Sequence, residues 1–553
     1  MNNSCKYFFD RVLELLHKKT FDSYRVSLHN PYTIFDELSI SLEKFNKKRI
    51  KRFDPTITSI IEEALSILNN KDLEKVFNFG SFTQKQIENH LKEKDSKEGK
   101  KNRTLSLISN TLIYENKDFR KKLLNEIRVL LKTDNEADFL LLDLFTGWWI
   151  TQLTFQGYSR KYILDKFRSN FKQFEKNKTI DEVIDGILDS FEKGNDKYDV
   201  IFKIKCNLEQ ELRSASNQLN FILDFPSEFK GKKFINDKLQ EKSSDEQYIK
   251  IQIESLDFQS SLKKALQIIS ETIDLNALHD SYNKIIIEKQ ALVIHAKSKL
   301  YRFLPIEDSL DGFYNYQESE FHRFIDNFKK MKNDSVVREK INSAIRFYKI
   351  GNESVEVEHK ILNYWIGFEQ LFSAVDSDED AIKRIKSYFI AMNCVYYWQR
   401  KTNYLISTIS RAGLELKVVD LLPTNTTACD TLSPFVKTRY INLLKTLNHS
   451  QELKSFLIQH IKRLEQHLTR IYRVRNEIVH EGRSKIDLFL IAGHLRHYLI
   501  FSIEQITNEF IENPTLEQID DVFVYFETLL ERIKSAENIQ EIFSIKEFRG
   551  FME

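Results

Sequence analysis

The segment best suited to chemistry runs from Arg470 to Gly482 and reads RIYRVRNEIVHEG. It closes a helix expected to begin near residue 451, and Gly482 stands where a glycine would end that helix. At about 100° per residue, Asn476 and His480 share one helix face, and Arg475 lies beside them. We therefore expect a guanidinium, an amide and an imidazole to meet at one helix end.

These three side-chain types suit a phosphodiester. Arg475 would hold phosphate oxygens bidentately and stabilise the charge of the transition state. His480 would transfer a proton at near-neutral pH, the usual role of a catalytic imidazole. The alternative is an ordinary charged helix end on the surface, and the residue types alone do not separate the two readings.

Other chemistries lack their sequence signatures. The chain has no GxxxxGK[ST], GxGxxG, HExxH or GxSxG motif, so P-loop, Rossmann, zincin and serine-hydrolase sites are not indicated. His460 and His467 lie two turns apart on one helix, roughly 10 Å, and His494 and His497 are three residues apart. We expect these histidines on the solvated surface, with no metal site and no cofactor.

The stretch Lys44–Arg52 (KFNKKRIKR) carries six cations in nine residues. It could bind phosphates electrostatically. A solvated helix face is the commoner explanation of such a run. Both readings stay open.

Composition predicts a mainly α, multi-domain protein. The chain has 553 residues but only 14 glycines and 7 prolines, too few for a hairpin-rich fold. The net charge of +2 does not indicate a globally basic nucleic-acid binder. The four cysteines form no CxxC pair, and Phe139–Ile150, the most apolar window, is too short to span a bilayer. We expect a cytoplasmic protein with no membrane association.

The periodicity of apolar residues predicts the division of the chain. Residues 1–195 and 335–511 read as helical domains, 301–334 as a linker and 512–553 as a helical extension. Ser159, Ser335 and the Thr179–Glu182 pair have the form of helix N-terminal caps.

The unit at 196–300 changes period and is predicted to be a small α/β domain. Its strands and helices can be read in the order β-α-β-β-α-β, which is a ferredoxin-like arrangement. The elements expected are strands at 200–205, 221–225, 249–253 and 285–294, and helices at 208–218 and 262–273.

The sequence RNEIVH resembles the Rx4-6H motif of the HEPN superfamily, in its R-N-x-x-x-H form. Upstream, Ile361–Phe372 (ILNYWIGFEQLF) and the AIRFYK segment from Ala344 are similar to helices of ApeA-like HEPN domains. The resemblance covers about 335–511, roughly a third of the chain, and little is recognised in residues 1–330.

The resemblance implies a helical bundle that cleaves RNA without metal, using the ribose 2′-OH as nucleophile and leaving a 2′,3′-cyclic phosphate. Arg475 would bind the scissile phosphate, His480 would act as acid or base, and Asn476 would orient the site. Glu369 would be the acidic group that positions Arg475 or His480, with a structural ion pair as its alternative. Arg473 would add a phosphate contact, although an i,i+4 salt bridge with Glu477 is the simpler role.

HEPN domains usually pair, so the resemblance also implies a homodimer with a composite site. ApeA-like proteins are associated with antiphage defence by abortive infection, which implies an effector restrained by its N-terminal domains until a trigger, such as a phage component, arrives. Two alternatives remain. One is a catalytically silent HEPN module that binds RNA or nucleotide or mediates dimerisation, and the other is a helical scaffold in which RNEIVH is coincidental.

Overall fold

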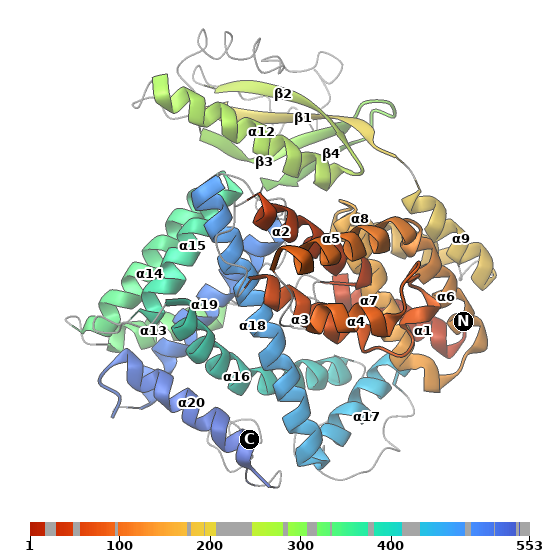
Figure 1. Ribbon diagram of the computed structural model, residues 1–553. Helices are drawn as coiled ribbons and strands as arrows, with labels where there is room; N and C mark the ends of the chain where they lie inside the picture. The colour runs from red at the N-terminus through yellow and green to blue at the C-terminus, as the bar shows by residue number, and fades with distance from the viewer. Residues whose placement is uncertain are drawn as a thin grey trace.

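The computed structural model is mainly helical, as composition predicts, and contains a small antiparallel sheet (Figure 1). The structure describes residues 1–16, 29–47, 56–93, 98–173, 178–192, 194–205, 246–279, 286–306, 318–331, 335–373, 381–411, 432–481, 488–513, 515–537 and 541. Within them, no helix is both long enough and apolar enough to cross a bilayer.

The N-terminal part is a set of helices packed around one aromatic-rich core. Its helices are α1 (Asn3–Leu16), α2 (Pro31–Asn46), α3 (Thr56–Leu68), α4 (Gln84–Lys92), α5 (Glu98–Glu115), α6 (Phe119–Thr133), α7 (Phe139–Phe155), α8 (Arg160–Phe171) and α9 (Ile180–Phe191). The predicted caps are present, since Ser159 accepts from the amide of Tyr162 and Thr179 forms a capping box with Glu182. The apolar window at 139–150 lies in α7, which is largely buried, as expected, although Leu140 is exposed.

In its described residues, the middle part is a four-stranded antiparallel sheet with one long helix packed against it. Its elements are β1 (Asp196–Lys205), β2 (Glu246–Ser255), α12 (Phe258–His279), β3 (Ile286–His295) and β4 (Tyr301–Pro305), and the strand order is β2-β1-β3-β4.

The central pairing fits the order that the ferredoxin-like prediction requires. In that fold the first strand lies between the third and the fourth and is antiparallel to both. The strands predicted as third and fourth are β2 and β3 of the structure, and β1 lies between them and is antiparallel to both. Val200 pairs with Ile251 on one side and Val293 on the other. The expected helix at 208–218 and strand at 221–225 lie outside the described residues, so the full topology stays a prediction. β4 is an edge strand that periodicity did not predict.

The C-terminal part is a helical bundle with its own core. Its helices are α13 (Glu318–Lys330), α14 (Val336–Glu353), α15 (Val357–Phe372), α16 (Ala381–Arg411), α17 (Pro434–Asn448), α18 (Ser450–Glu481), α19 (Leu488–Glu512) and α20 (Ile519–Ser535). Ser335 caps α14, as predicted.

The bundle extends beyond the predicted limits at both ends. Residues 301–334 do not form a plain linker, because they hold β4 and α13, and Phe324 and Met331 join the bundle core. The predicted extension at 512–553 contributes α20, whose Phe523 stacks on Phe372 with ring centroids 4.9 Å apart. The bundle therefore spans α13 to α20.

Two sets of contacts fix the sheet domain to the helices below it (Figure 1). The Asp257 carboxylate accepts hydrogen bonds from the backbone and hydroxyl of Ser159, both at 2.8 Å, and also caps α12 by accepting from the Ser260 amide. Further along α12, the Lys263 ammonium lies 5.2 Å from the ring centre of Phe489 in the first turn of α19. The sheet domain thus contacts both helical parts.

The two helical parts also contact each other directly. Arg439 of α17 donates to Glu14 of α1 at 3.2 Å and to Asp143 of α7 at 3.1 Å. Helix α18 runs between the two parts, alongside the N-terminal helices on one side and the bundle on the other (Figure 1). The motif segment is the last portion of this helix.

Candidate functional site

The motif occupies the final turns of α18, which packs one face into the bundle and leaves part of the opposite face open. Leu464, Leu468, Ile471 and Val474 recur at three- and four-residue spacing and are buried. Beyond them the helix continues to Glu481. The apolar stripe therefore fixes which way the following motif residues face.

The three motif side chains are all accessible. Arg475 and Asn476 are partly exposed, and His480 in the last turn is exposed. The Arg475 Nη1 donates a hydrogen bond of 2.9 Å to the Asn476 Oδ1. This bond turns the guanidinium toward the side of the helix that carries Asn476, the side that the helical count assigns to His480.

Glu369 reaches the motif helix only through intermediaries among its described contacts. Its carboxylate accepts a 3.0 Å hydrogen bond from the Trp365 indole, one turn earlier on α15. The Trp365 ring lies 5.5 Å, centre to centre, from the ring of Tyr472 on α18. Neither Arg475 nor His480 appears among those contacts, so a direct positioning role stays a prediction without a described contact.

Arg473 lies inside the protein rather than at the open end of α18. Its side chain is 7% exposed, and the guanidinium is bound to the Glu37 carboxylate of α2. Its Nε also lies 3.8 Å from the Glu477 carboxylate, which is the i,i+4 pair expected as the simpler role. This geometry favours the ion pair over the predicted phosphate contact.

A buried cluster of charges joins α18 to the N-terminal helices. Arg470 donates to Glu37 at 3.1 Å and to Glu63 of α3 at 2.7 Å. His29 adds a contact of 2.6 Å to Glu37. Burial by itself raises the pKa of the Glu37 carboxyl, but Arg470, Arg473 and His29 outweigh it and hold the pKa well below its usual value. Glu37 is therefore ionised and paired.

The basic stretch begins beside the motif. The Lys44 ammonium lies 2.8 Å from the Glu477 carboxylate. Glu477 follows Asn476 in the sequence and precedes His480 by three residues. Lys47 is exposed and pairs with Glu43 of its own helix. The rest of the stretch, residues 48–52, lies outside the described residues. The sequence did not indicate that Lys44 and Glu477 would meet.

The expected surface histidines are buried, which corrects that prediction. His460, His467, His494 and His497 are all 5% exposed or less. Two of them are hydrogen-bonded to each other, since the His494 Nδ1 lies 3.0 Å from the His467 Nε2. These positions continue the apolar stripe of α18 and the buried face of α19. In the described part of the chain, no group of three or more histidine, cysteine or acidic side chains could hold a metal ion.

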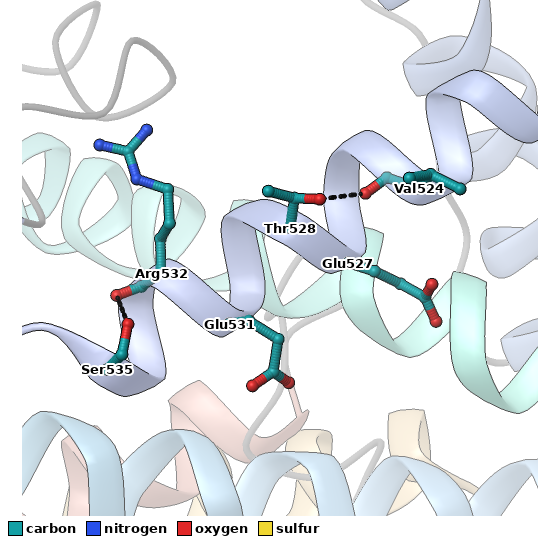
Figure 2. Close-up of a pocket in the computed structure, with 6 residues that line it drawn as sticks. All are labelled: Val524, Glu527, Thr528, Glu531, Arg532 and Ser535. Atoms are coloured by element: carbon teal, nitrogen blue, oxygen red, sulfur yellow. Dashed lines mark hydrogen bonds between the residues drawn. The ribbon is translucent and has the colours of Figure 1, made fainter.

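A surface pocket lies away from the motif, on α20 (Figure 2). Its lining residues all come from that one helix: Val524, Glu527, Thr528, Glu531, Arg532 and Ser535. Figure 2 shows Glu527 and Glu531 on one side of the helix and Arg532 on the other. No predicted site residue lines this pocket.

Comparisons with protein-family models, with curated proteins and with solved structures found no match to this chain. The HEPN assignment therefore stays a prediction, based on RNEIVH and the upstream helix.

Proposed function

We propose that this chain is a metal-independent endoribonuclease of the HEPN type. The observation that carries the proposal is the accessible helix end of α18, where Arg475, Asn476 and His480 stand in R-N-x-x-x-H spacing and Arg475 bonds Asn476 at 2.9 Å. A buried or fully ion-paired motif could not contact a substrate.

The proposed reaction is an internal transfer at phosphorus. The ribose 2′-oxygen forms a bond to the scissile phosphorus and the bond to the 5′-oxygen of the next nucleotide breaks, which gives a 2′,3′-cyclic phosphate and a 5′-hydroxyl. Arg475 binds the non-bridging oxygens and stabilises their charge in the transition state. His480 transfers a proton to or from the ribose oxygens. Asn476 orients Arg475 through their hydrogen bond.

The biological setting proposed is antiphage defence, with the active species a homodimer. This part of the proposal depends on the resemblance of 335–511 to ApeA-like HEPN domains. Sedimentation of the active protein tests the dimer, and a strictly monomeric active enzyme would remove the composite site.

The experiment is RNA cleavage by the purified chain with EDTA present. We expect products with cyclic-phosphate ends, and no cleavage at a nucleotide whose 2′-hydroxyl has been replaced by hydrogen. His480→Ala and Arg475→Ala should each abolish cleavage at an unchanged melting temperature.

The chain offers matched controls for both substitutions. His449 is an exposed histidine directly before α18, and Arg463 is an exposed arginine on the same helix. His449→Ala and Arg463→Ala should keep full activity. Cleavage that persists in both motif variants, or an absolute requirement for Mg²⁺, would rule out the proposed site.

A further inference from the structure

Ion pairs at two levels join α2 and α18, and the two helices run in the same general direction. Glu37 contacts Arg470, and seven residues later Lys44 contacts Glu477, seven residues after Arg470. Seven residues are about two helical turns, so both helices advance together along the contact. The N-terminal domain therefore contacts α18 as far along the helix as the motif itself.

One stripe of α18 faces α2 throughout this contact. Arg470, Arg473, Glu477 and His480 recur at spacings of three and four residues, which places them on one side of a helix. The first three are buried in ion pairs with α2 or α3. His480 is the next member of the stripe and is exposed. Among the described residues, the ion pairs along this stripe thus end one turn before the histidine.

The last of these contacts lies within the motif itself. The Lys44 and Glu477 side chains are 11% and 8% exposed, with 2.8 Å between ammonium and carboxylate. A buried pair of this kind resists separation, because removing one partner leaves an uncompensated charge inside the protein. Glu477 is flanked in the helix by Asn476 and lies three residues before His480, so whatever holds Glu477 also holds that turn.

We propose that Lys44 of the N-terminal domain is a positioning residue of the ribonuclease site, acting through Glu477. The ion pair fixes the last turns of α18 against α2, and so fixes Arg475, Asn476 and His480 relative to the substrate. This inference rests on the proposed function. It makes the N-terminal domain part of the working site.

The test compares the two single charge reversals, Lys44→Glu and Glu477→Lys, with the double swap that carries both. Each single variant should lower kcat by about ten-fold or more, because a small displacement of reacting groups is costly. The two reversals change the charge that RNA meets in opposite directions, so a loss of kcat in both cannot come from altered RNA attraction. The double swap restores an opposite-charge pair and should recover most of kcat. Lys44→Met, a neutral side chain of similar length, covers the case in which a reversal prevents folding.

Lys47→Met is the matched control, since Lys47 caps the C-terminus of the same helix, is exposed, and among the described residues forms its ion pair with Glu43 of that helix. It should leave kcat unchanged. Active wild-type protein whose kcat is unaffected by Lys44→Met would overturn the inference and leave the proposed function standing. A double swap that regains the melting temperature but not kcat would also overturn it. Wild-type protein that cuts no RNA would instead reject the proposed function, and the positioning role with it.

Discussion

Arg470 of α18 and Glu37 of α2 form a buried ion pair although 433 residues separate them in the chain. The arginine Nε and Nη2 both donate to the carboxylate, at 3.1 and 3.2 Å, and Nη2 reaches Glu63 as well. The two helical parts of the molecule are thus joined by a buried ion pair.

Arg470→Met should destabilise the protein markedly. The change leaves Glu37 and Glu63 buried with less compensation, a loss that costs about 3–5 kcal/mol for comparable pairs. Urea unfolding measures it, with the exposed Arg463→Met as the control. A loss below about 1 kcal/mol would mean that water replaces the guanidinium without penalty.

Glu37 should make the stability of the fold depend on pH in the acidic range. Its pKa in the folded chain lies well below the usual 4.5, because burial is outweighed by Arg470, Arg473 and His29. The contribution of ionised Glu37 to the free energy of unfolding is therefore complete above about pH 4.5. It is lost as the pH falls further toward the pKa of Glu37 in the folded chain. Glu37→Gln should be less stable at pH 7 and should lose less on going to pH 3. Melting temperatures across this range test it, and parallel curves for the two proteins would contradict it.

His467 should make stability depend on pH over a higher range than Glu37 does. Burial, with Arg470 and His29 adding to it, lowers the pKa of His467 from 6.5 to about 3. Between these values the unfolded chain binds the extra proton, so stability falls as pH drops from about 6.5. His467→Gln, which can still bond Tyr498 and His494, should flatten the curve between pH 6.5 and 4.5. An unchanged slope in the variant would show that the ring is already charged in the fold.

Glu369→Gln should keep both stability and cleavage, because an amide oxygen can still accept from the Trp365 indole. Glu369→Leu removes the acceptor and should cost about 1–3 kcal/mol through the unpaired indole N–H. Melting curves and cleavage rates of the two variants separate the roles. If the Gln variant lost cleavage at a normal melting temperature, the carboxylate charge would belong to the site.

Local patterns predicted the helices well, because their signals lie within a few residues. Ser335 and the Thr179–Glu182 pair mark helix starts without reference to the rest of the chain. Ile249, Ile251 and Ile253 alternate with polar residues and lie in β2. β4 was missed because its five residues are too few to show a clear period.

The motif was found from spacing, but its surroundings could not be. Nothing near Lys44 in the sequence indicates Glu477, and nothing near Glu37 indicates Arg470. The buried histidines had a usable signal: His460 and His467 continue the three- and four-residue repeat of Leu457, Leu464 and Ile471. A polar residue in an apolar stripe is buried with its partner, and the partner here is supplied by α19 or α16.

The Asp257 carboxylate joins the sheet domain to the N-terminal helices. It anchors the start of α12 to Ser159 of the N-terminal helices. Lys263, farther along the same helix, contacts the ring of Phe489 in the first turn of α19. A change at either contact would therefore reach both helical parts of the molecule through this one helix.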